Sequence, residues 1–590
     1  MMLALQIIIG LVLLLALAGL VIRVSHPLPP LEPRPHSRHF TDTVDTPLGQ
    51  SVTRARQGQP DHCSGVHLLE NGRDAFAARI LLARAAVRSL DVQYYIWHND
   101  LCGTLMLEAM RQAADRGVRV RLLLDDNGIA GLDTLLAALD HHPEIEIRLF
   151  NPFVLRRPKM LGYLADFFRL NRRMHNKCFI ADGQAAIVGG RNIGDEYYDA
   201  RDDGQFSDLD VLAIGPVVED TARDFDRYWD SESAYPSDRI LPPVPAEDLP
   251  ALMDHARQLE QTPAAKRYIQ AIADEPFIAQ MLGGQLQFDW AAVRLISDNP
   301  AKGVGKAGRD GMLTTALLAA IGEPRRVLRL VSGYFVPTAD GARSFAEQAA
   351  SGVDVAIFTN AFEATDVWVV HAGYAERRKA MLRAGIRLFE MRGPDQDLAP
   401  NEHAEAEAGT VPPEETAISG FREKWRRRRF RHRHRRHHPR RRLIGTGPGG
   451  GGLRRRGIIG SGGIGGSGGP NPRGQVLRSS ATTLHAKVFI VDEERLFIGS
   501  FNFDPRSMHL NTELGFLIES PALARKAAHS FETETPQRAY EVVLADDGRL
   551  NWIERCPDGR QVVHTTEPGM SLFQRSGIRL LSHMPIEWLL

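Results

Sequence analysis

The chain has 590 residues, 43% of them hydrophobic, and it carries 72 basic and 72 acidic side chains. This composition is ordinary for a folded protein and excludes a wholly disordered chain, while the length predicts two to four domains. The four cysteines, Cys63, Cys102, Cys178 and Cys556, are spaced neither as zinc ligands nor as a small disulfide scaffold, which argues against both classes.

The net charge of zero hides an uneven distribution of charge. Residues 421–456 carry fifteen arginines and one lysine against one glutamate, so the rest of the chain holds 56 basic and 71 acidic residues. The chain is therefore an acidic protein with one strongly basic insert, and its net charge alone does not exclude anionic partners.

A membrane anchor is predicted at the N-terminus. Residues 1–22 contain no charged side chain, and no Lys or Arg precedes this apolar run. Its length suits a transmembrane helix, which we place at residues 1–23, better than a cleaved signal peptide, which is the alternative. Arg23, Arg34 and Arg38 follow, which favours a cytoplasmic body, although the side of the membrane stays open. Residues 24–65 form a Pro-rich linker.

An internal repeat organises the chain from residue 66 to residue 540. The matching strand candidates are Ser89–Trp97 with Leu330–Val336, Arg119–Leu124 with Asp354–Phe358, and the tetrapeptide Ile-Arg-Leu-Phe at 147–150 and 386–389. Strands that alternate with helical stretches predict an α/β fold of two similar lobes, each a mixed, mostly parallel sheet flanked by helices. The expected domains are the first lobe at 66–240, a connecting segment at 241–290, the second lobe at 291–540 and a C-terminal extension at 541–590.

An amphipathic stretch lies at residues 155–174. Met160, Leu164, Phe167 and Phe168 fall on one helical face, and arginines and a lysine flank them. Such a helix could dip into the membrane interface, and a plain core helix is the alternative.

The strongest signal is the pattern His-x-Lys-x4-Asp-x6-Gly-[Gly/Ser]-x-Asn, which occurs twice at identical spacing. The first copy holds His175, Lys177, Asp182, Gly190 and Asn192, and the second holds His485, Lys487, Asp492, Ser500 and Asn502. His and Lys two residues apart on a strand point to the same face. Each Asp opens a turn sequence that is followed by another apolar strand, so each copy predicts a hairpin.

Folding the second strand of each hairpin back brings small residues beside the lysine and the asparagine towards the histidine. Small residues let the backbone come close to a ligand. Each copy then offers an imidazole, an ammonium and an amide at one point, a combination that suits an anionic tetrahedral group. Asp182 and Asp492, at the turns and with parity opposite to the lysines, are expected to support the structure.

The second lobe carries a long insertion before its motif. His175 follows Phe150 by 25 residues, whereas His485 follows Phe389 by 96. We place the insertion at residues 395–480, where the arginine run is followed by a segment with 14 glycines in 26 residues, and we expect disorder there. Attraction to anionic lipid headgroups is its favoured function, with nucleic-acid binding and no function as alternatives.

The doubled motif resembles the signature of the phospholipase D superfamily, and the resemblance spans both lobes. The segments Gln93–His98, Asp298–Lys302 and Pro585–Leu590 are similar to the bacterial C-type cardiolipin synthases, whereas the Arg/Gly-rich insert departs from that family. The resemblance implies that both motifs converge on one site between the lobes. There, one histidine attacks a phosphodiester and the other protonates the leaving alcohol.

The resemblance also implies the role of each residue. His175 is the nucleophile that becomes phosphohistidine, and His485 is the general acid and later the base. Histidine-orienting acids follow the hairpins in this family, and Asp208 and Glu513 match them. The groups expected to bind phosphate are Lys177, Lys487, Asn192, Asn502, Gly190 and Ser500, with no metal or other cofactor. Asp182 and Asp492 complete the two catalytic motifs.

We therefore expect a phosphatidyltransferase anchored in the bacterial inner membrane, which makes cardiolipin from phosphatidylglycerol and a second phospholipid. The resemblance makes phosphatidylethanolamine a candidate cosubstrate. A hydrolytic phospholipase D is the alternative, and a nuclease is a further one, because the same motif cleaves DNA in other members. The anchor and the acidic body argue against a nucleic-acid partner, whereas the arginine insert argues for one, and we expect none. The sequence does not predict the oligomeric state.

Overall fold

The computed structural model describes residues 2–201, 205–245, 254, 258–365, 367–393, 482–556, 558–571, 573–575 and 577–578. The insert expected at 395–480 and the terminal segment Pro585–Leu590 lie outside the described residues. The rest of the two lobes belongs to a single compact unit.

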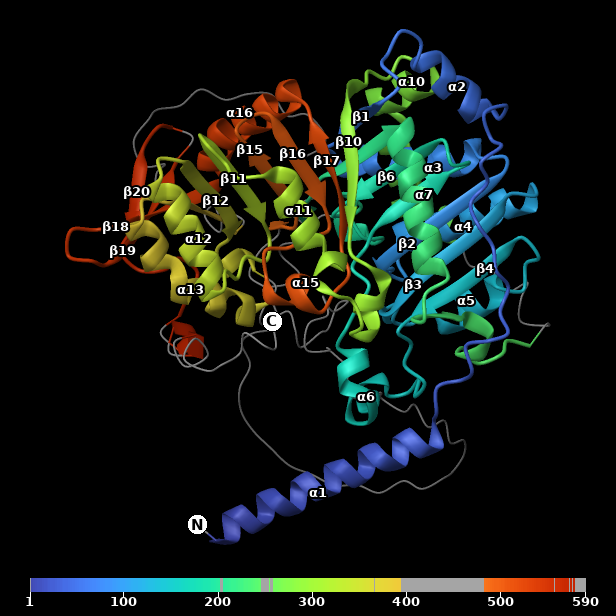
Figure 1. Cartoon of the computed structure of the whole chain (residues 1–590), viewed down its shortest axis with the longest axis horizontal. Coiled ribbons are helices and arrows are strands. Elements are labelled where there is room, and N and C mark those ends of the chain that lie inside the picture. The colour runs from blue at the N-terminus through green and yellow to red at the C-terminus, as the bar shows by residue number, and fades with distance from the viewer. Residues whose placement is uncertain are drawn as a thin grey trace, which may run out of the picture. The chain divides into compact units, whose positions relative to one another are not determined.

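The described strands of both lobes form one continuous sheet of eighteen strands (Figure 1). In the first lobe the order is β9 (Ala234–Pro236), β4 (Ile145–Phe150), β3 (Arg119–Gly128), β2 (Ser89–Ile96), β5 (Cys178–Ala181), β6 (Ala185–Gly189), β8 (Asp210–Ile214) and β1 (Cys63–Leu69). In the second it is β10 (Asp289–Ser297), β17 (Leu514–Glu519), β16 (Arg495–Gly499), β15 (Lys487–Val491), β11 (Val327–Ser332), β12 (Asp354–Asn360), β13 (Arg387–Met391), β18 (Ala539–Leu544), β19 (Leu550–Arg555) and β20 (Gln561–His564). Antiparallel pairing of β1 with β10 joins the lobes.

The α/β class and the two-lobed repeat are confirmed, but the expectation of mostly parallel sheets is wrong. Parallel pairing within this sheet is confined to β2-β3-β4 and its counterpart β11-β12-β13. Each motif folds as a hairpin, and its first strand pairs antiparallel with the strand that opens the repeat, β5 with β2 and β15 with β11. The part of the sheet in the second lobe also continues beyond residue 540. There β18 pairs with β13, and β19 and β20 extend the sheet further.

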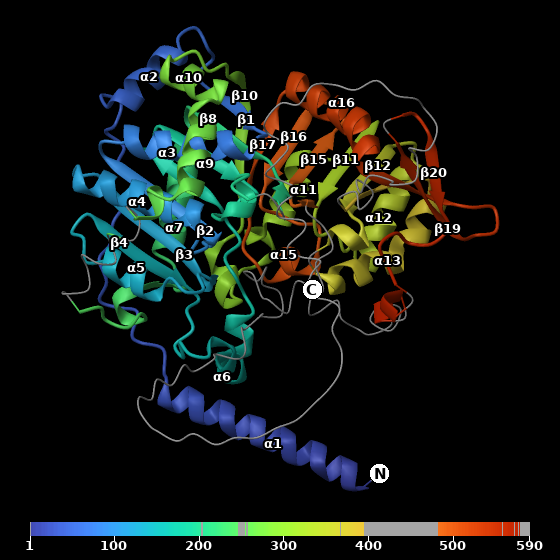
Figure 2. The same cartoon turned by 180° about the vertical axis from the view of Figure 1, so that it is seen from behind.

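Helices cover both faces of the sheet (Figures 1 and 2). On one face, α7 (Pro216–Trp229) and α16 (Pro521–Arg538) share a hydrophobic core that spans both lobes. The opposite face of the first lobe packs against α3 (Gly72–Ala85), α4 (Leu101–Asp115) and α5 (Asp133–Leu139). The same face of the second lobe packs against α11 (Leu313–Ile321), α12 (Ala339–Ala350) and α13 (Trp368–Arg383).

Further helices and strands lie outside these layers, along with several short 3-10 turns. These helices and strands are α2 (Pro47–Ala55), α6 (Gly162–Leu170), α9 (Pro263–Ala273), α10 (Pro276–Leu282), α15 (Pro505–His509) and a separate two-stranded parallel sheet of β7 (Gln205–Ser207) and β14 (Thr482–Leu484). Helix α2 lies within the stretch expected as a Pro-rich linker. The small sheet joins one strand from each lobe directly before the second motif.

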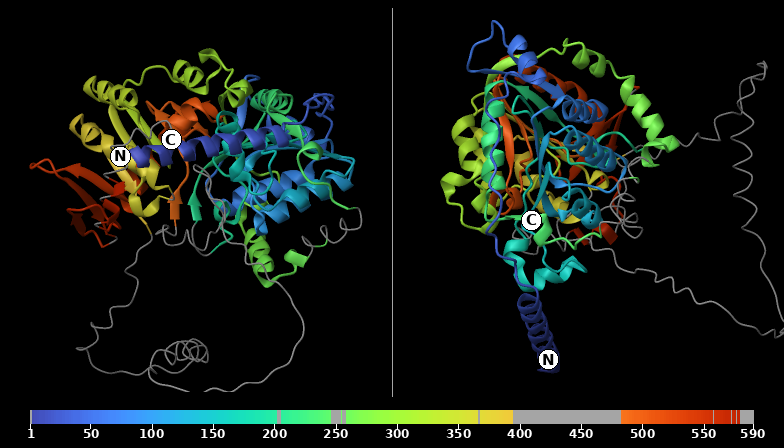
Figure 3. Two further views of the ribbon diagram at one scale, coloured as in Figure 1. Left: turned by 90° about the horizontal axis from the view of Figure 1, so that it is seen from below. Right: turned by 90° about the vertical axis from the view of Figure 1, so that its right-hand side faces the viewer.

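The N-terminal helix α1 (Met2–Ser25) has the length and composition expected of a membrane anchor (Figure 3). Its candidate span, Leu5–Ser25, is 6% buried, and it is the one described helix long and apolar enough to cross a membrane. A signal sequence would have a similar length and apolar composition. Near its C-terminal end α1 packs against α6, and a side chain at Gly19 would lie 2.3 Å from the carbonyl oxygen of Leu164.

Candidate active site

The two motif hairpins hold their histidine and lysine side chains at the junction of the lobes. Cys178 pairs with Val188 and Val488 pairs with Ile498, so Gly189 and Gly499 come next to the lysines, as the sequence predicts. Both turns use residues with positive φ, Asp182 (51°) and Asp492 (55°). Such residues tolerate the left-handed conformation better than most.

The motif aspartates tie the hairpins to the start of the first strand of each repeat. The Asp182 carboxylate accepts hydrogen bonds from the backbone nitrogens of Val87, Arg88 and Ser89, at 2.8 to 3.2 Å. In the second lobe, Asp492 accepts them in the same way from the backbone nitrogens of residues 325, 326 and 327. These contacts are structural, in line with the parity argument.

Each motif histidine is paired with a carboxylate of the other lobe. Nδ1 of His175 lies 2.8 Å from Oε2 of Glu513, and Nδ1 of His485 lies 2.5 Å from Oδ2 of Asp208. Backbone hydrogen bonds also cross between the lobes: His175 N donates to the carbonyl oxygen of Thr512, and His485 N donates to the carbonyl oxygen of Ser207. The sequence identified the two carboxylates but not this crossed pairing.

Gly190 and Ser500 occupy equivalent positions in the two motifs. Gly190 makes room for the Asp208 carboxylate, and Ser500 donates a hydrogen bond to the Glu513 carboxylate. A Cβ at Gly190 would lie 2.1 Å from Oδ1 of Asp208, so only glycine fits there. Ser500 Oγ instead donates to Oε2 of the longer Glu513, and Ser507 Oγ donates to Oε1 at 2.8 Å. The expected contact of Gly190 and Ser500 with phosphate stays a prediction.

The two motif asparagines differ in their surroundings. Asn192 Oδ1 accepts from the backbone nitrogen of Ile96 at 3.1 Å, and its Nδ2 donates to the hydroxyl of Tyr197 at 2.9 Å. In contrast, Oδ1 of Asn502 is buried and has no hydrogen-bond partner in the part of the chain that the structure describes. A buried polar atom of this kind is suited to bind a ligand, so Asn502 fits the predicted phosphate contact better than Asn192.

Burial sets the protonation of the site. Both lysines are 1% exposed, and each donates to the carbonyl oxygen of its own motif histidine. Burial lowers the pKa of His175 to about 4 and that of His485 to about 3, with Lys177 and Lys487 adding to the effect. Both imidazoles are therefore neutral in the empty site near pH 7. Burial also lowers the pKa of Lys177.

Several residues around the histidines were missed from the sequence. Asp298 Oδ2 accepts from the backbone nitrogen of Glu513 and from Nζ of Lys302, both at 2.9 Å, so this buried ion pair supports the carboxylate that holds His175. The rings of Tyr95 and Tyr197 stand edge-on to His175 and His485, at 5.0 and 5.4 Å between centroids. The spacing of Asp298 and Lys302 was a usable signal for an ion pair. Tyr95 lies in the Gln93–His98 segment that the resemblance singled out, whereas the sequence carried no signal for Tyr197.

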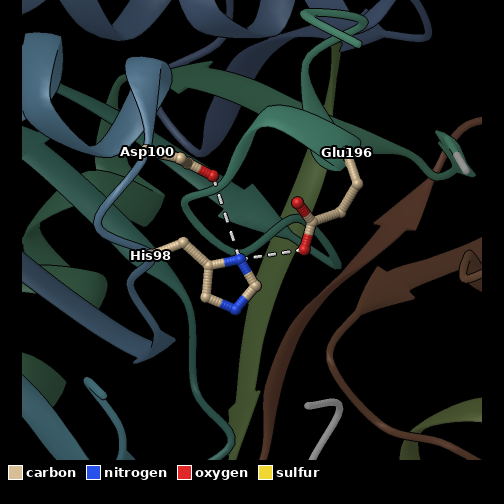
Figure 4. A group of neighbouring side chains, drawn as sticks. All are labelled: His98, Asp100 and Glu196. Carbon is tan, nitrogen blue, oxygen red and sulfur yellow. Dashed lines mark ion pairs between the residues drawn. The ribbon is translucent and has the colours of Figure 1, made fainter. Parts of the chain in front are cut away.

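A second group of polar side chains, His98, Asp100 and Glu196, could in principle hold a metal ion (Figure 4). His98 Nδ1 lies 3.0 Å from Oε1 of Glu196 and 3.9 Å from Oδ2 of Asp100. Asp100 also caps α4, with Oδ1 accepting from the backbone nitrogen of Gly103 and Oδ2 from that of Asp195. These contacts hold the segment that follows β2 against the loop that follows β6.

Comparison with known proteins identifies the family. The chain is 42% identical over 543 residues to cardiolipin synthase C of Escherichia coli strain K12, a match that covers 92% of this chain and 99% of that protein. The chain belongs to the cardiolipin synthase family of phospholipase D-like phosphatidyltransferases. The family model described as "Cardiolipin synthase, PLD-like domain" matches residues 80–229 and 473–535, which include both motifs.

A more distant relative matches part of the chain. Cardiolipin synthase A of Edwardsiella ictaluri strain 93-146 is 26% identical over 59% of this chain and 62% of its own length. A crystal structure of phosphatidylserine synthase from Haemophilus influenzae Rd KW20 aligns with 90% of this chain and 96% of its own, at 12% identity and a TM-score of 0.49.

Proposed function

We propose that this cardiolipin synthase transfers a phosphatidyl group from a donor phospholipid to the headgroup hydroxyl of phosphatidylglycerol, through a phosphohistidine at His175. The observation that carries the proposal is the crossed pairing of two neutral histidines with Glu513 and Asp208, beside two buried lysines. The site thus offers a nucleophile, a proton donor and cationic groups for a phosphodiester.

In the first step, Nε2 of His175 attacks phosphorus while Glu513 holds the proton on Nδ1 and balances the developing positive charge. An N–P bond forms, and the P–O bond to the donor's headgroup breaks. His485, protonated once the anionic substrate is bound, gives its proton to the leaving alkoxide. Lys177 and Lys487 stabilise the non-bridging oxygens, and Asn502 supplies a further polar contact.

In the second step, His485 is neutral and accepts the proton of the acceptor's hydroxyl group. The alkoxide attacks phosphorus, the N–P bond breaks, and His175 returns to its starting state. With two phosphatidylglycerol molecules the products are cardiolipin and glycerol. With phosphatidylethanolamine as donor they are cardiolipin and ethanolamine.

Inner-membrane association follows from the family and from the apolar helix α1. We place the catalytic body on the cytoplasmic side, because Arg23 and further arginines follow the helix directly. A cysteine-accessibility assay on whole cells tests this placement, since labelling of an engineered surface cysteine by an impermeant reagent would contradict it.

The function is tested with the full-length protein in vesicles that hold phosphatidylglycerol labelled in its glycerol headgroup and phosphatidylethanolamine labelled in its ethanolamine. We expect labelled cardiolipin and release of one or both headgroups, which identifies the donor. His175→Ala should abolish the product, and cells without their own synthases should regain cardiolipin only from the wild-type chain. Phosphatidic acid as the sole product would replace transfer with hydrolysis.

A further inference from the structure

Helix α6 presents an apolar surface beside the membrane anchor. Leu161, which immediately precedes α6, is 42% exposed, and Leu164, Phe167 and Phe168 are 41%, 38% and 85% exposed. A soluble surface rarely leaves a group of large apolar side chains together in water. Arg157, exposed on the same segment, and Arg23, exposed at the end of α1, flank the group.

The position of α6 along α1 fixes its depth relative to a bilayer. The two helices touch at Gly19, where the missing side chain lets the backbones approach closely. Gly19 lies six residues before Ser25, the last residue of α1, so the contact is about 9 Å from the end of the helix at 1.5 Å per residue. Interfacial helices bury their apolar faces to about 5–10 Å, which matches this depth.

The exposed residues are linked to the active site by a short series of contacts. Ring contacts run from Phe168 through Phe167 and Tyr163 to the buried Phe153, and the Arg173 guanidinium lies 5.3 Å from the Phe153 ring. Arg173 directly precedes Met174 and His175. From the second lobe, the Arg506 side chain donates to the side-chain and main-chain oxygens of Asn171.

We propose that α6 inserts its apolar side chains into the lipid surface next to α1 and so holds the site formed by the two motifs at the level of the headgroups. The occupant of this surface is the bilayer, since α6 packs against the candidate membrane-spanning helix α1 and basic side chains flank its apolar group. The proposal rests on the proposed function, because only an enzyme that draws its substrates from a bilayer needs this placement.

The test uses the full-length protein in phosphatidylcholine vesicles, with two forms of labelled phosphatidylglycerol. One form is a long-chain lipid within the bilayer, and the other is the dihexanoyl lipid, supplied as monomers in solution. Phe168→Asp should lower turnover of the bilayer lipid by about tenfold or more, because it removes one large inserted side chain and adds a charge. Turnover of the monomeric lipid should stay within about twofold of the wild type.

Two further variants make the result specific. Leu318→Asp, at a leucine that is 71% exposed on α11, is the matched control and should change neither activity. Phe168→Trp should keep both activities, and its added fluorescence should be quenched by lipids brominated near the headgroup.

Equal activity of Phe168→Asp and the wild type on the bilayer lipid would overturn the proposal, as would equal losses on both lipids or a change in oligomeric size. If the wild type makes no cardiolipin while the tryptophan is still quenched, the proposed function fails and the docking of α6 stands.

Discussion

Replacing Glu513 by glutamine tests the crossed pairing of the two lobes. Glu513 is fully buried, and its oxygens accept from His175 Nδ1 at 2.8 Å, from Ser500 Oγ and from Ser507 Oγ. Glutamine has nearly the same shape but no charge. Its Oε1 can still accept from His175, so the variant should fold and keep the histidine tautomer.

The magnitude follows from the charge that the variant lacks. In the proposed transfer His175 becomes a phosphorylated imidazolium buried against Glu513, and removing one partner of a buried ion pair costs about 3–5 kcal/mol. The hydrogen bond that glutamine keeps restores about 0.5–1.5 kcal/mol. The difference is about 1.5–4.5 kcal/mol, and at 1.36 kcal/mol per tenfold change in rate we expect kcat to fall by roughly tenfold to two-thousandfold.

The assay is the rate of labelled cardiolipin formation in vesicles, normalised to folded protein. The matched control is Glu390→Gln, at a glutamate that is also fully buried but binds Tyr374 and Trp552 away from the motifs. It should affect thermal stability rather than kcat. If Glu513→Gln retains more than half of the wild-type kcat, the inferred role of the crossed pairing in catalysis is wrong.

Three other predictions follow from the site. Gly190→Ala should abolish turnover, because its Cβ would displace the Asp208 carboxylate, whereas Ser500→Ala should cost only about tenfold; comparable kcat for the two variants would contradict this. Asp182→Asn should lower the melting temperature while kcat per folded enzyme stays within about threefold, because among the described residues its carboxylate binds only backbone nitrogens. Binding of inorganic phosphate at pH 6 should take up close to one proton per site, measured with an indicator dye, because the anion raises the pKa of His485 from about 3; no uptake would refute the proposed origin of the general acid.

The local structure of the motifs could be predicted from the sequence because it depends on short-range rules. The turn sequence at Asp182 predicted the hairpin, and the period of two along its first strand placed small residues opposite Lys177, although β5 begins only at Cys178 and leaves His175 and Lys177 just before it. The repeat then extended both expectations to the second lobe. The direction of strand pairing was missed, because periodicity does not distinguish parallel from antiparallel neighbours.

The crossed pairing could not be predicted, because it depends on how the two lobes pack together. His175 and Glu513 are 338 residues apart in the chain. Their pairing depends on the packing of the two lobes, which are joined through β1 and β10. The same holds for Asp298, whose contact with the Glu513 backbone crosses 215 residues. The resemblance singled out the Asp298–Lys302 segment, but it did not predict that Asp298 binds the backbone nitrogen of Glu513.

The two halves of the site differ in a way that favours His175 as the nucleophile. The nucleophilic histidine stays cationic for as long as the covalent intermediate lasts, so it needs a fixed counter-charge throughout, whereas the general acid is cationic only when it holds the transferred proton. Glu513 receives two serine hydroxyls, and its backbone is held by Asp298. The Asp208 carboxylate, apart from His485, accepts only from the backbone nitrogen of Leu209 among the described residues, while the Asp208 backbone oxygen accepts from Arg191. The carboxylate with more hydroxyl donors thus faces His175, an asymmetry that the motifs themselves show only as the difference between Gly190 and Ser500.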